Sequence, residues 1–330
     1  MPALNCFARG LRSAALATFA AMTTVSGALA ADKITFTTDF GLYGRHAYYF
    51  VALEKGLYEK EGLDVNIVRS QGSAAAVKQV ASGTAQLGFA DAFAVILARA
   101  NDKIPVKLVA MVYHLPPHAI YVLKDSKIAQ PKDLEGKTLA DTAYSSVPKI
   151  FPIFAKAAGI DPAKVKWVIA TPDALPGMLA NGQVDGVGQF VVGEPLLAGA
   201  AAPKEILGIE YSKGGLDYYS NGIIASDDLI KSNPDLIRRF VKATLAGLQY
   251  AIDNPQEAGE ILSKRHKEIN AKIAAAETAK VKDLAVQKGV PLGSIDPARV
   301  QKTIDIVAGA YQLKNPVTID DVYAPGFLPK

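Results

Sequence analysis

Large aromatic and polar side chains gather in one short segment near the start of the chain. They are Phe40, Tyr43, Arg45, His46, Tyr48 and Tyr49. Histidine can hydrogen-bond a heterocycle or a carboxylate, the planar fork of arginine suits a sulfonate or carboxylate, and aromatic faces stack on flat molecules. Two adjacent tyrosines cannot face the same way on one helix, so at least one of them is structural. The segment predicts a pocket for something flat or polar, although His46 could also be only a capping or packing residue.

Serines stand where two predicted helices begin. Ser73 begins one, and Ser145 and Ser146 begin the other. Helix amino termini present free N–H groups that bind anions or carbonyl oxygens. Serines at such positions are also ordinary helix caps, so a binding role and a capping role both stay open.

Two further aromatic candidates, Tyr218 and Tyr219, lie in a glycine-rich segment. Aromatic residues ordinarily belong to the core. We expect Tyr43 and one of these two tyrosines to be the better candidates for stacking on a ligand, because glycine-rich loops hold them.

Motifs for catalysis and metal binding are weak or missing in the sequence. Ser146 and Lys149 match S-x-x-K, but neither S-D-N nor K-T-G follows, and no G-x-S-x-G or phosphate-binding loop is present. His114 and His118 are four residues apart, yet Pro116 and Pro117 between them prevent the helical face that a metal would need. We therefore expect no catalytic residue, no metal and no cofactor.

The elements that must position these side chains follow from the hydrophobic pattern. A strand over 33–38 ends before Gly41 and Gly44, and the apolar periodicity of 46–58 predicts a helix. The aromatic segment therefore joins the carboxyl end of a strand to the start of a helix. Ligands bind at that place in open α/β sheets.

The rest of the chain alternates between predicted strands and helices. Strands are expected at 86–90, 106–113, 119–125, 138–140, 164–170 and 222–225, and helices at 74–81, 92–100, 145–159, 173–181, 233–253, 256–263, 273–289 and 297–311. The order predicts an α/β fold.

An internal similarity suggests how the α/β units are arranged. The sequence QVASGTAQLGFAD at 79–91 and the sequence MLANGQVDGVGQF at 178–190 share a helix end, a stop with glycine and a short strand. This favours two lobes of similar topology that aim loops at a shared crevice. The loops would carry Asp91 in one lobe and Gln189 in the other, the latter leading to Glu194. The alternative is that helix, glycine and strand simply recur in α/β proteins.

The amino-terminal segment 1–30 has the pattern of a cleaved secretion signal. Arg9 and Arg12 precede an apolar run, and Ala28-Leu29-Ala30 is typical of a cleavage site. Its removal lowers the formal charge from +4 to +2 and removes Cys6, the one cysteine of the chain. A nearly neutral chain without clustered cations gives no argument for nucleic-acid binding. We expect a soluble protein of the periplasm.

Two stretches carry a resemblance to a known group of proteins. After the histidine-containing loop comes VALEKGLYEKEGLDVNIV, and later comes NPDLIRRFVKATLAGLQYAIDNPQEA. They resemble the periplasmic substrate-binding proteins of ABC transporters of the nitrate, sulfonate, taurine and thiamine-pyrimidine type. The resemblance covers essentially the whole mature chain. It implies a two-lobed type II periplasmic-binding fold, with lobe 1 from 31–123 and 222–330, lobe 2 from 124–221, and a ligand cleft between them. The lobes would close by a hinge near 124–126 and 214–221.

The resemblance also implies a function. His46 in RHAYYFVALEKG looks most like the branch that binds pyrimidine precursors of thiamine, although Gly44 and Arg45 replace the Asn-Thr of that branch. Glu194 stands where such proteins often use an acidic residue, and a carboxylate can accept two parallel hydrogen bonds from an aminopyrimidine. A plain glutamate at a helix start is the alternative.

The implied partners are a small solute and a membrane permease with an ATP-hydrolysing subunit, and we expect a monomer. The resemblance also leaves other ligands open. Sulfonates, taurine, nitrate-like anions or aromatic carboxylates are the alternative solutes.

Two enzymatic alternatives must be weighed against solute binding. The fungal enzymes that make thiamine pyrimidine resemble the same group and consume a histidine of their own chain, which would make His46 a reactant. Those enzymes are cytosolic and carry a cysteine-rich iron motif, whereas this mature chain has no cysteine. A secreted hydrolase using Ser146 has no supporting base or acid in the sequence. We therefore expect a binding protein that is not an enzyme.

Overall fold

The structure is a computed structural model of the chain and describes residues 31–329. The expected secretion signal, 1–30, lies outside the described residues. Within residues 31–329, no helix combines the length and the apolar character needed to cross a membrane.

The first sheet has the strand order β2-β1-β3-β10-β4. It consists of β1 (Asp32–Thr37), β2 (Leu63–Val68), β3 (Leu87–Asp91), β4 (Val106–Met111) and β10 (Asn221–Ser226). β1 runs parallel to both β2 and β3, whereas β10 is antiparallel to β3 and β4. β10 is therefore a central strand that the chain supplies only after it has returned from the second sheet.

The second sheet repeats this arrangement with the order β7-β6-β8-β5-β9. It consists of β5 (His118–Leu123), β6 (Thr138–Asp141), β7 (Lys166–Ile169), β8 (Gly186–Phe190) and β9 (Ile206–Glu210). β6 pairs in parallel with β7 and β8, and β5 is antiparallel to β8 and β9. Two sheets with equivalent strand orders confirm the expected two-lobed α/β architecture, and we use lobe 1 and lobe 2 for the parts built on the first and second sheets.

The internal similarity falls on equivalent places in the two sheets. α3 (Ser73–Ala81) leads to β3, and α6 (Leu175–Ala180) leads to β8. Gly83 and Gly182, with φ of +74° and +65°, follow the two helices in a conformation that glycine adopts at no steric cost. The shared pattern therefore marks one structural unit used in each lobe.

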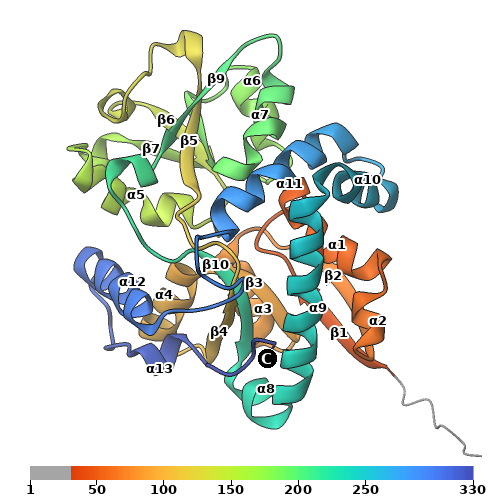
Figure 1. The fold of residues 1–330 in the computed structure, drawn as a ribbon. Helices are drawn as coiled ribbons and strands as arrows, with labels where there is room; N and C mark the ends of the chain where they lie inside the picture. Colours follow the sequence, from red (N-terminus) through yellow and green to blue (C-terminus); the bar gives the residue numbers. More distant parts are fainter. Residues whose placement is uncertain (1–30, 330) are drawn as a thin grey trace, which may run out of the picture. The chain divides into compact units, whose positions relative to one another are not determined.

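Helices pack on both sheets (Figure 1). In lobe 1 they are α1 (Ala47–Glu54), α2 (Leu57–Lys60), α3, α4 (Ala92–Asp102), α8 (Asp227–Ser232), α9 (Pro234–Asp253), α10 (Pro255–Arg265), α11 (Ala271–Ala285), α12 (Pro297–Ala310) and α13 (Ile319–Val322), and in lobe 2 they are α5 (Val147–Ala157), α6 and α7 (Glu194–Ala201). The long helix α9 packs along α1 and α2.

The bounds of α9 follow from residues at its two ends. Asn233 caps it by accepting a hydrogen bond from the backbone N–H of Leu236, and Pro234 occupies the first turn. Pro255 cannot continue the helix and begins α10. Buried residues recur every three or four positions, including Ile237, so the helix was predictable from its apolar face.

Two expected helices differ from the structure, and two strands were not predicted. The helix predicted at 46–58 is divided by Gly56, which has φ of +65° and separates α1 from α2. The helix predicted at 273–289 begins at Ala271 and ends at Ala285, before a tight turn at Gly289. β2 and β9 were not predicted.

The largest difference concerns where the chain first crosses between sheets. The expected lobe 1 ended at residue 123 and so included most of the strand predicted at 119–125, but β5 pairs with β8 and β9 in the second sheet. The crossing therefore lies at 112–117, where Pro116 and Pro117 cannot donate the hydrogen bonds of a sheet. The return crossing lies at 211–220, close to the expected 214–221. We keep the division into lobes, and a hinge at these crossings, as a proposal with this earlier first boundary.

Candidate functional site

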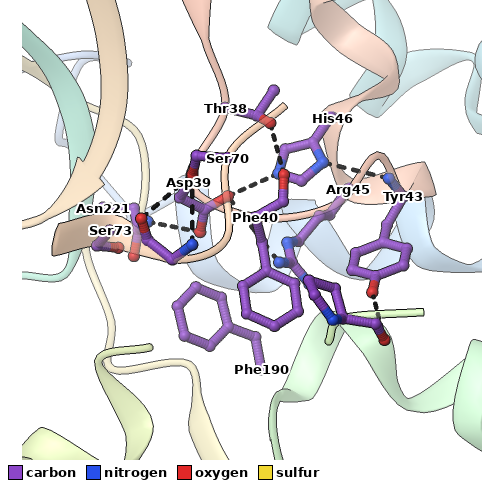
Figure 2. Close-up of polar contacts among 12 residues, drawn as sticks. Thr38, Asp39, Phe40, Tyr43, Arg45, His46, Ser70, Ser73, Phe190 and Asn221 are labelled. Atoms are coloured by element: carbon purple, nitrogen blue, oxygen red, sulfur yellow. Dashed lines mark hydrogen bonds and ion pairs between the residues drawn. The ribbon is translucent and has the colours of Figure 1, made fainter. Parts of the chain in front are cut away.

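The loop after β1 brings several candidate residues together (Figure 2). It leads into a single turn of 3₁₀ helix, η1 (Gly44–His46), which packs against α11. A β-carbon on Gly44 would stand 2.2 Å from the carbonyl oxygen of Ala274, so only glycine allows this close approach. The tight turn fixes the positions of Arg45 and His46 beyond the carboxyl end of β1.

His46 is fully buried and holds Asp39 (Figure 2). Its Nδ1 accepts a hydrogen bond from the backbone N–H of Tyr43 at 3.3 Å. The ring proton is therefore on Nε2, which donates to Oδ1 of Asp39 at 2.7 Å. Burial lowers the pKa of His46, against the opposing effect of Asp39, so the ring is neutral near pH 7.

Asp39 is an ionised carboxylate in the interior. Its Oδ2 accepts a hydrogen bond from the side-chain amide of Asn221, at the start of β10, at 2.9 Å. Burial alone would raise the pKa of Asp39, but the positive charge of Arg45 and the bond from His46 hold it below its ordinary value. Asp39 therefore carries a negative charge that lobe 1 keeps in a fixed position.

Arg45 connects the two lobes although it is only 1% exposed. Its Nη1 donates to Oε1 of Gln189 in lobe 2 at 3.0 Å, and its Nη2 lies 3.9 Å from Asp39. The guanidinium carbon lies 5.0 Å from the ring centroids of both Tyr43 and Phe190. These contacts place one cation between aromatic faces of both lobes.

Lobe 2 contributes a second buried carboxyl group, Asp141, at the end of β6. It accepts hydrogen bonds from the backbone N–H of Thr142 at 2.7 Å and from the hydroxyl of Ser145 at 2.9 Å. Burial raises the pKa of Asp141 to about 7, and these two bonds only partly oppose that effect. Asp141 can therefore exist near neutral pH as an acceptor or, when protonated, as a donor.

A narrow cavity of about 10 Å³ lies between these groups, enough for about one water molecule. It is lined by Asp39, Phe40, Arg45, Gly72, Ser73, Asp141, Ser145, Ser146, Val147, Gly188, Gln189 and Phe190. Of the expected site residues, the structure brings Phe40, Arg45, Ser73, Ser145, Ser146 and Gln189 together here. We call this space the central cavity.

Three other expected residues lie outside the lining of this cavity. Asp91 caps α4 and accepts a hydrogen bond from the hydroxyl of Ser220 at 2.6 Å. Tyr218 is fully buried, and its hydroxyl lies 2.9 Å from Nδ1 of His118. The hydroxyl of Tyr219 accepts from the backbone N–H of Asp296. All three side chains form hydrogen bonds within the protein, and none of them lines the cavity.

Tyr43 and Glu194 also lie outside the lining. The hydroxyl of Tyr43 donates to the carbonyl of Pro172 in lobe 2 at 3.3 Å, so this residue joins the lobes (Figure 2). Glu194 begins α7, pairs with Lys280 of α11 at 2.8 Å, and has a side chain 42% exposed. Its position agrees with the alternative that Glu194 is an ordinary glutamate at the start of a helix, without contact to a ligand.

Asp39, Asp141 and Phe190 line the cavity although they were absent from the expected set. Each is the last residue of a strand or follows within two residues of one. The position at the carboxyl end of a strand could have identified both aspartates, because ligands of α/β sheets bind there. The burial that raises the pKa of Asp141 has no signal in the sequence.

The structure brings a histidine to Ser146, where sequence reasoning found no base. Nε2 of His118 lies 2.9 Å from the Ser146 hydroxyl and 3.3 Å from Oδ2 of Asp91. In a Ser-His-Asp triad the carboxylate binds the ring nitrogen opposite to the serine. Here both groups approach the same nitrogen, and Tyr218 occupies the other. The arrangement does not match a hydrolytic triad.

Within residues 31–329, no group of three or more His, Cys, Asp and Glu side chains is placed to hold a metal ion. The side chains that line the central cavity can hydrogen-bond a ligand, stack on it and attract it by charge. Asp39, Arg45 and Asp141 supply the charged groups, and Phe40 and Phe190 supply the aromatic faces.

Comparisons with known proteins identify the family of this chain. Residues 44–258 match the family described as NMT1/THI5 like. The chain is 25% identical over 311 residues to a formylaminopyrimidine-binding protein of Halalkalibacterium halodurans, with 91% of this chain and 92% of that protein covered. It is 25% identical over 318 residues to the riboflavin-binding protein RibY of Chloroflexus aurantiacus, with coverage of 86% and 82%.

Similar proteins also include an enzyme and a solved sulfonate-binding structure. A 4-amino-5-hydroxymethyl-2-methylpyrimidine phosphate synthase of Legionella pneumophila is 23% identical over 232 residues, with 70% of this chain and 73% of that protein covered. The alkanesulfonate-binding protein SsuA from Xanthomonas axonopodis pv. citri superimposes with a TM-score of 0.70 at 15% identity, covering 90% of this chain and 99% of that one. The chain belongs to the NMT1/THI5-like family and has the type II fold of periplasmic solute-binding proteins.

Proposed function

We propose that the protein is the solute-binding component of an ABC importer and holds a small, flat, polar solute between its lobes. One observation carries the proposal: the polar groups of the central cavity come from both lobes, yet only about 10 Å³ is free. A solute can enter only if the lobes separate, and it can then be enclosed by groups from each side. Closure around a solute is the behaviour that a transport receptor needs.

The charges of the cavity favour an aminopyrimidine over a simple anion. The guanidinium of Arg45 is partnered by Asp39, and Asp141 adds a second carboxyl group. A sulfonate or nitrate would have to lie close to these acidic groups, which costs Coulomb energy at low dielectric. An aminopyrimidine has N–H donors for them and a flat ring for Phe40 and Phe190. The similarity to a formylaminopyrimidine-binding protein supports the same choice.

We assign the carboxyl contact with the pyrimidine to Asp141 and not to Glu194. Asp141 lines the cavity and is 2% exposed, whereas Glu194 is paired with Lys280 outside it. Each oxygen of Asp141 accepts one hydrogen bond from the protein and has a second lone pair for a ligand. His46 then acts through Asp39, which it holds in place.

We propose binding in preference to synthesis, although the family includes synthases. Both ring nitrogens of His46 are occupied by internal hydrogen bonds, to the Tyr43 backbone and to Asp39. These bonds suit a histidine that fixes a neighbour. Mass spectrometry of the protein purified from the cells that express it should find His46 unchanged, and loss of mass at this residue would favour a synthase.

The proposed setting is the periplasm, reached through the secretion signal expected at 1–30, with the protein acting as a monomer. The partner would be a membrane permease with an ATP-hydrolysing subunit, and no nucleic acid is involved. The similarity in fold to the sulfonate-binding protein SsuA supports this setting.

The function can be tested by a thermal-shift screen of residues 31–330, followed by isothermal titration calorimetry. The panel contains formylaminopyrimidine and hydroxymethylpyrimidine, with riboflavin, taurine, an alkanesulfonate, nitrate and benzoate as competing classes. A ligand that binds only the folded state raises the melting temperature by mass action. A shift with the pyrimidines alone is expected. A shift with sulfonates or carboxylates alone would keep the transport role and overturn the choice of solute, and no shift with any compound would count against binding.

A further inference from the structure

A second and larger pocket adjoins the central cavity. Its volume is about 320 Å³, and its walls are α3, α4 and the segment 143–149 of lobe 2. Ser145 and Ser146 line both spaces and so stand at their boundary. The volume falls within the range of small-molecule pockets, about 300–1,000 Å³. We call this space the lateral pocket.

One wall of the lateral pocket is apolar. Phe93 and Leu97 are four residues apart on α4, as are Ala94 and Ala98, so these two adjacent pairs form one side of the helix. Ile104 extends this surface. Ala94, Leu97 and Ala98 are only partly buried. Apolar surface left open beside a polar binding cavity is suited to an apolar part of the same ligand.

The rim of the lateral pocket carries an excess of positive charge. Lys78 of α3 and Lys149 of α5 both line it, and neither forms an ion pair within the part of the chain that the structure describes. Lys78 lies 5.7 Å from the ring centroid of Tyr144, which also lines the pocket. Asp102 is the one acidic residue of this lining. An anionic group would therefore be attracted here.

We infer that the solute has two parts: a flat polar head in the central cavity, and an apolar substituent that passes Ser145 and Ser146 into the lateral pocket and ends in an anionic group. This inference rests on the proposed function and refines its solute class. An aminopyrimidine with an acidic acyl chain has these properties. A bare pyrimidine would leave the apolar face of α4 in water.

The inference can be tested with aminomethylpyrimidines that share one head and differ in their acyl group. N-formyl, N-butanoyl and N-succinyl compounds are titrated against residues 31–330 by calorimetry. The butanoyl compound should bind at least tenfold more tightly than the formyl compound, because three further carbon atoms leave water. The succinyl compound should bind as tightly as the butanoyl one or more so, with a preference that falls as salt is raised.

Variants separate the two parts of the pocket. Ala98→Trp fills the apolar wall, so the formyl and butanoyl compounds should bind equally. Ala308→Trp, on the exposed face of α12 and outside the lining, is the matched control and should keep the tenfold preference. Lys78→Met combined with Lys149→Met should weaken the succinyl compound and leave the butanoyl compound unchanged. Melting temperatures check that each variant is folded, and Ala94→Phe replaces Ala98→Trp if that protein is unstable.

The outcomes distinguish this inference from the proposed function. If the formyl compound binds and the longer compounds bind no better to the wild-type protein, the lateral pocket is not a subsite and the proposed function stands. A preference that survives both Ala98→Trp and Ala94→Phe would also overturn the inference. If none of the three compounds binds, the choice of a pyrimidine fails as well.

Discussion

Asp141 and Gly188 lie so close together that a β-carbon on residue 188 would stand 2.1 Å from Oδ2 of Asp141. Because residue 188 of β8 has no side chain, there is room beside it for the carboxyl group of Asp141 at the end of β6. Gly188→Ala should push Asp141 out of place, weaken pyrimidine binding at least tenfold, and cost about 1–3 kcal/mol of unfolding free energy through overpacking. Calorimetry and urea unfolding measure the two effects.

Gly177 provides the matched control for that variant. A β-carbon there meets no atom within 4 Å, and the residue lies in helix α6. Gly177→Ala should leave affinity unchanged and raise stability by a few tenths to about 1 kcal/mol. Equal losses in both alanine variants would show that the cost does not come from Asp141.

The pH dependence of stability should reveal Asp141. Its pKa in the folded protein is raised from 3.8 to about 7, chiefly by burial. Its contribution to stability is therefore complete below about pH 4 and is lost as pH rises through 7. Urea unfolding gives the free energy of unfolding at pH 4.5 and at pH 8. Asp141→Asn should reduce the difference between these two free energies by an amount on the order of 2–4 kcal/mol. Burial also raises the pKa of Glu277 to about 7, so this carboxyl group adds a pH dependence of the same sign. The Asp141→Asn variant keeps that second contribution. Parallel curves for the wild type and Asp141→Asn would contradict the assignment.

Two carboxylate variants distinguish the proposed pyrimidine contact from a surface ion pair. Asp141→Asn should weaken an aminopyrimidine at least tenfold and should not weaken a sulfonate. Glu194→Gln should change neither affinity by more than about threefold, because an exposed ion pair contributes little. If Glu194→Gln lost more affinity for the aminopyrimidine than Asp141→Asn, the carboxyl contact with the pyrimidine would have to be assigned to Glu194.

The bond between His46 and Asp39 should be visible as an energetic coupling. His46→Ala leaves Asp39 without one of its donors and should cost about 2–4 kcal/mol of stability together with ligand affinity. In a double-mutant cycle with Asp39→Asn, the coupling should exceed about 1 kcal/mol. Additive losses in urea unfolding would mean that the two residues act independently.

The contact between Arg45 and Gln189 should favour the closed arrangement of the lobes. Gln189→Ala removes the acceptor of a buried hydrogen bond that joins them. The ligand-free variant should therefore have a larger radius of gyration by small-angle X-ray scattering, and saturating ligand should restore the wild-type value. Glu205→Ala, which removes an exposed ion pair with Lys124 inside lobe 2, is the control and should not change the radius.

The sequence predicted the architecture because the two lobes use the same local signals. Two of these signals are short-range and can be recognised in the local sequence: the glycines that end helices, Gly83 and Gly182, and the residues that cap α9. The place where the chain enters the second sheet was harder to predict. β5 is buried along its whole length, and such a strand suits the core of either lobe.

The candidate site was predicted in part, for a related reason. The aromatic segment and the serines at helix starts led to Phe40, Arg45, Ser73 and Ser145, which do line the central cavity. His46 does not line the cavity and instead hydrogen-bonds Asp39, a pairing within one loop that side-chain types alone do not reveal. Likewise the partner of Glu194 lies 86 residues away on α11, so its ion pair could not be read from the chain.

The place of β10 in the first sheet also constrains the order in which the chain can fold. β10 lies between β3 and β4, so that sheet cannot be completed until residue 226 has been synthesised. All strands of the second sheet come earlier, between His118 and Glu210. Lobe 2 can therefore form its hydrogen bonds while the edges of β3 and β4 are still unpaired. Until β10 is available, those two edges are the surfaces that a chaperone would have to protect from aggregation.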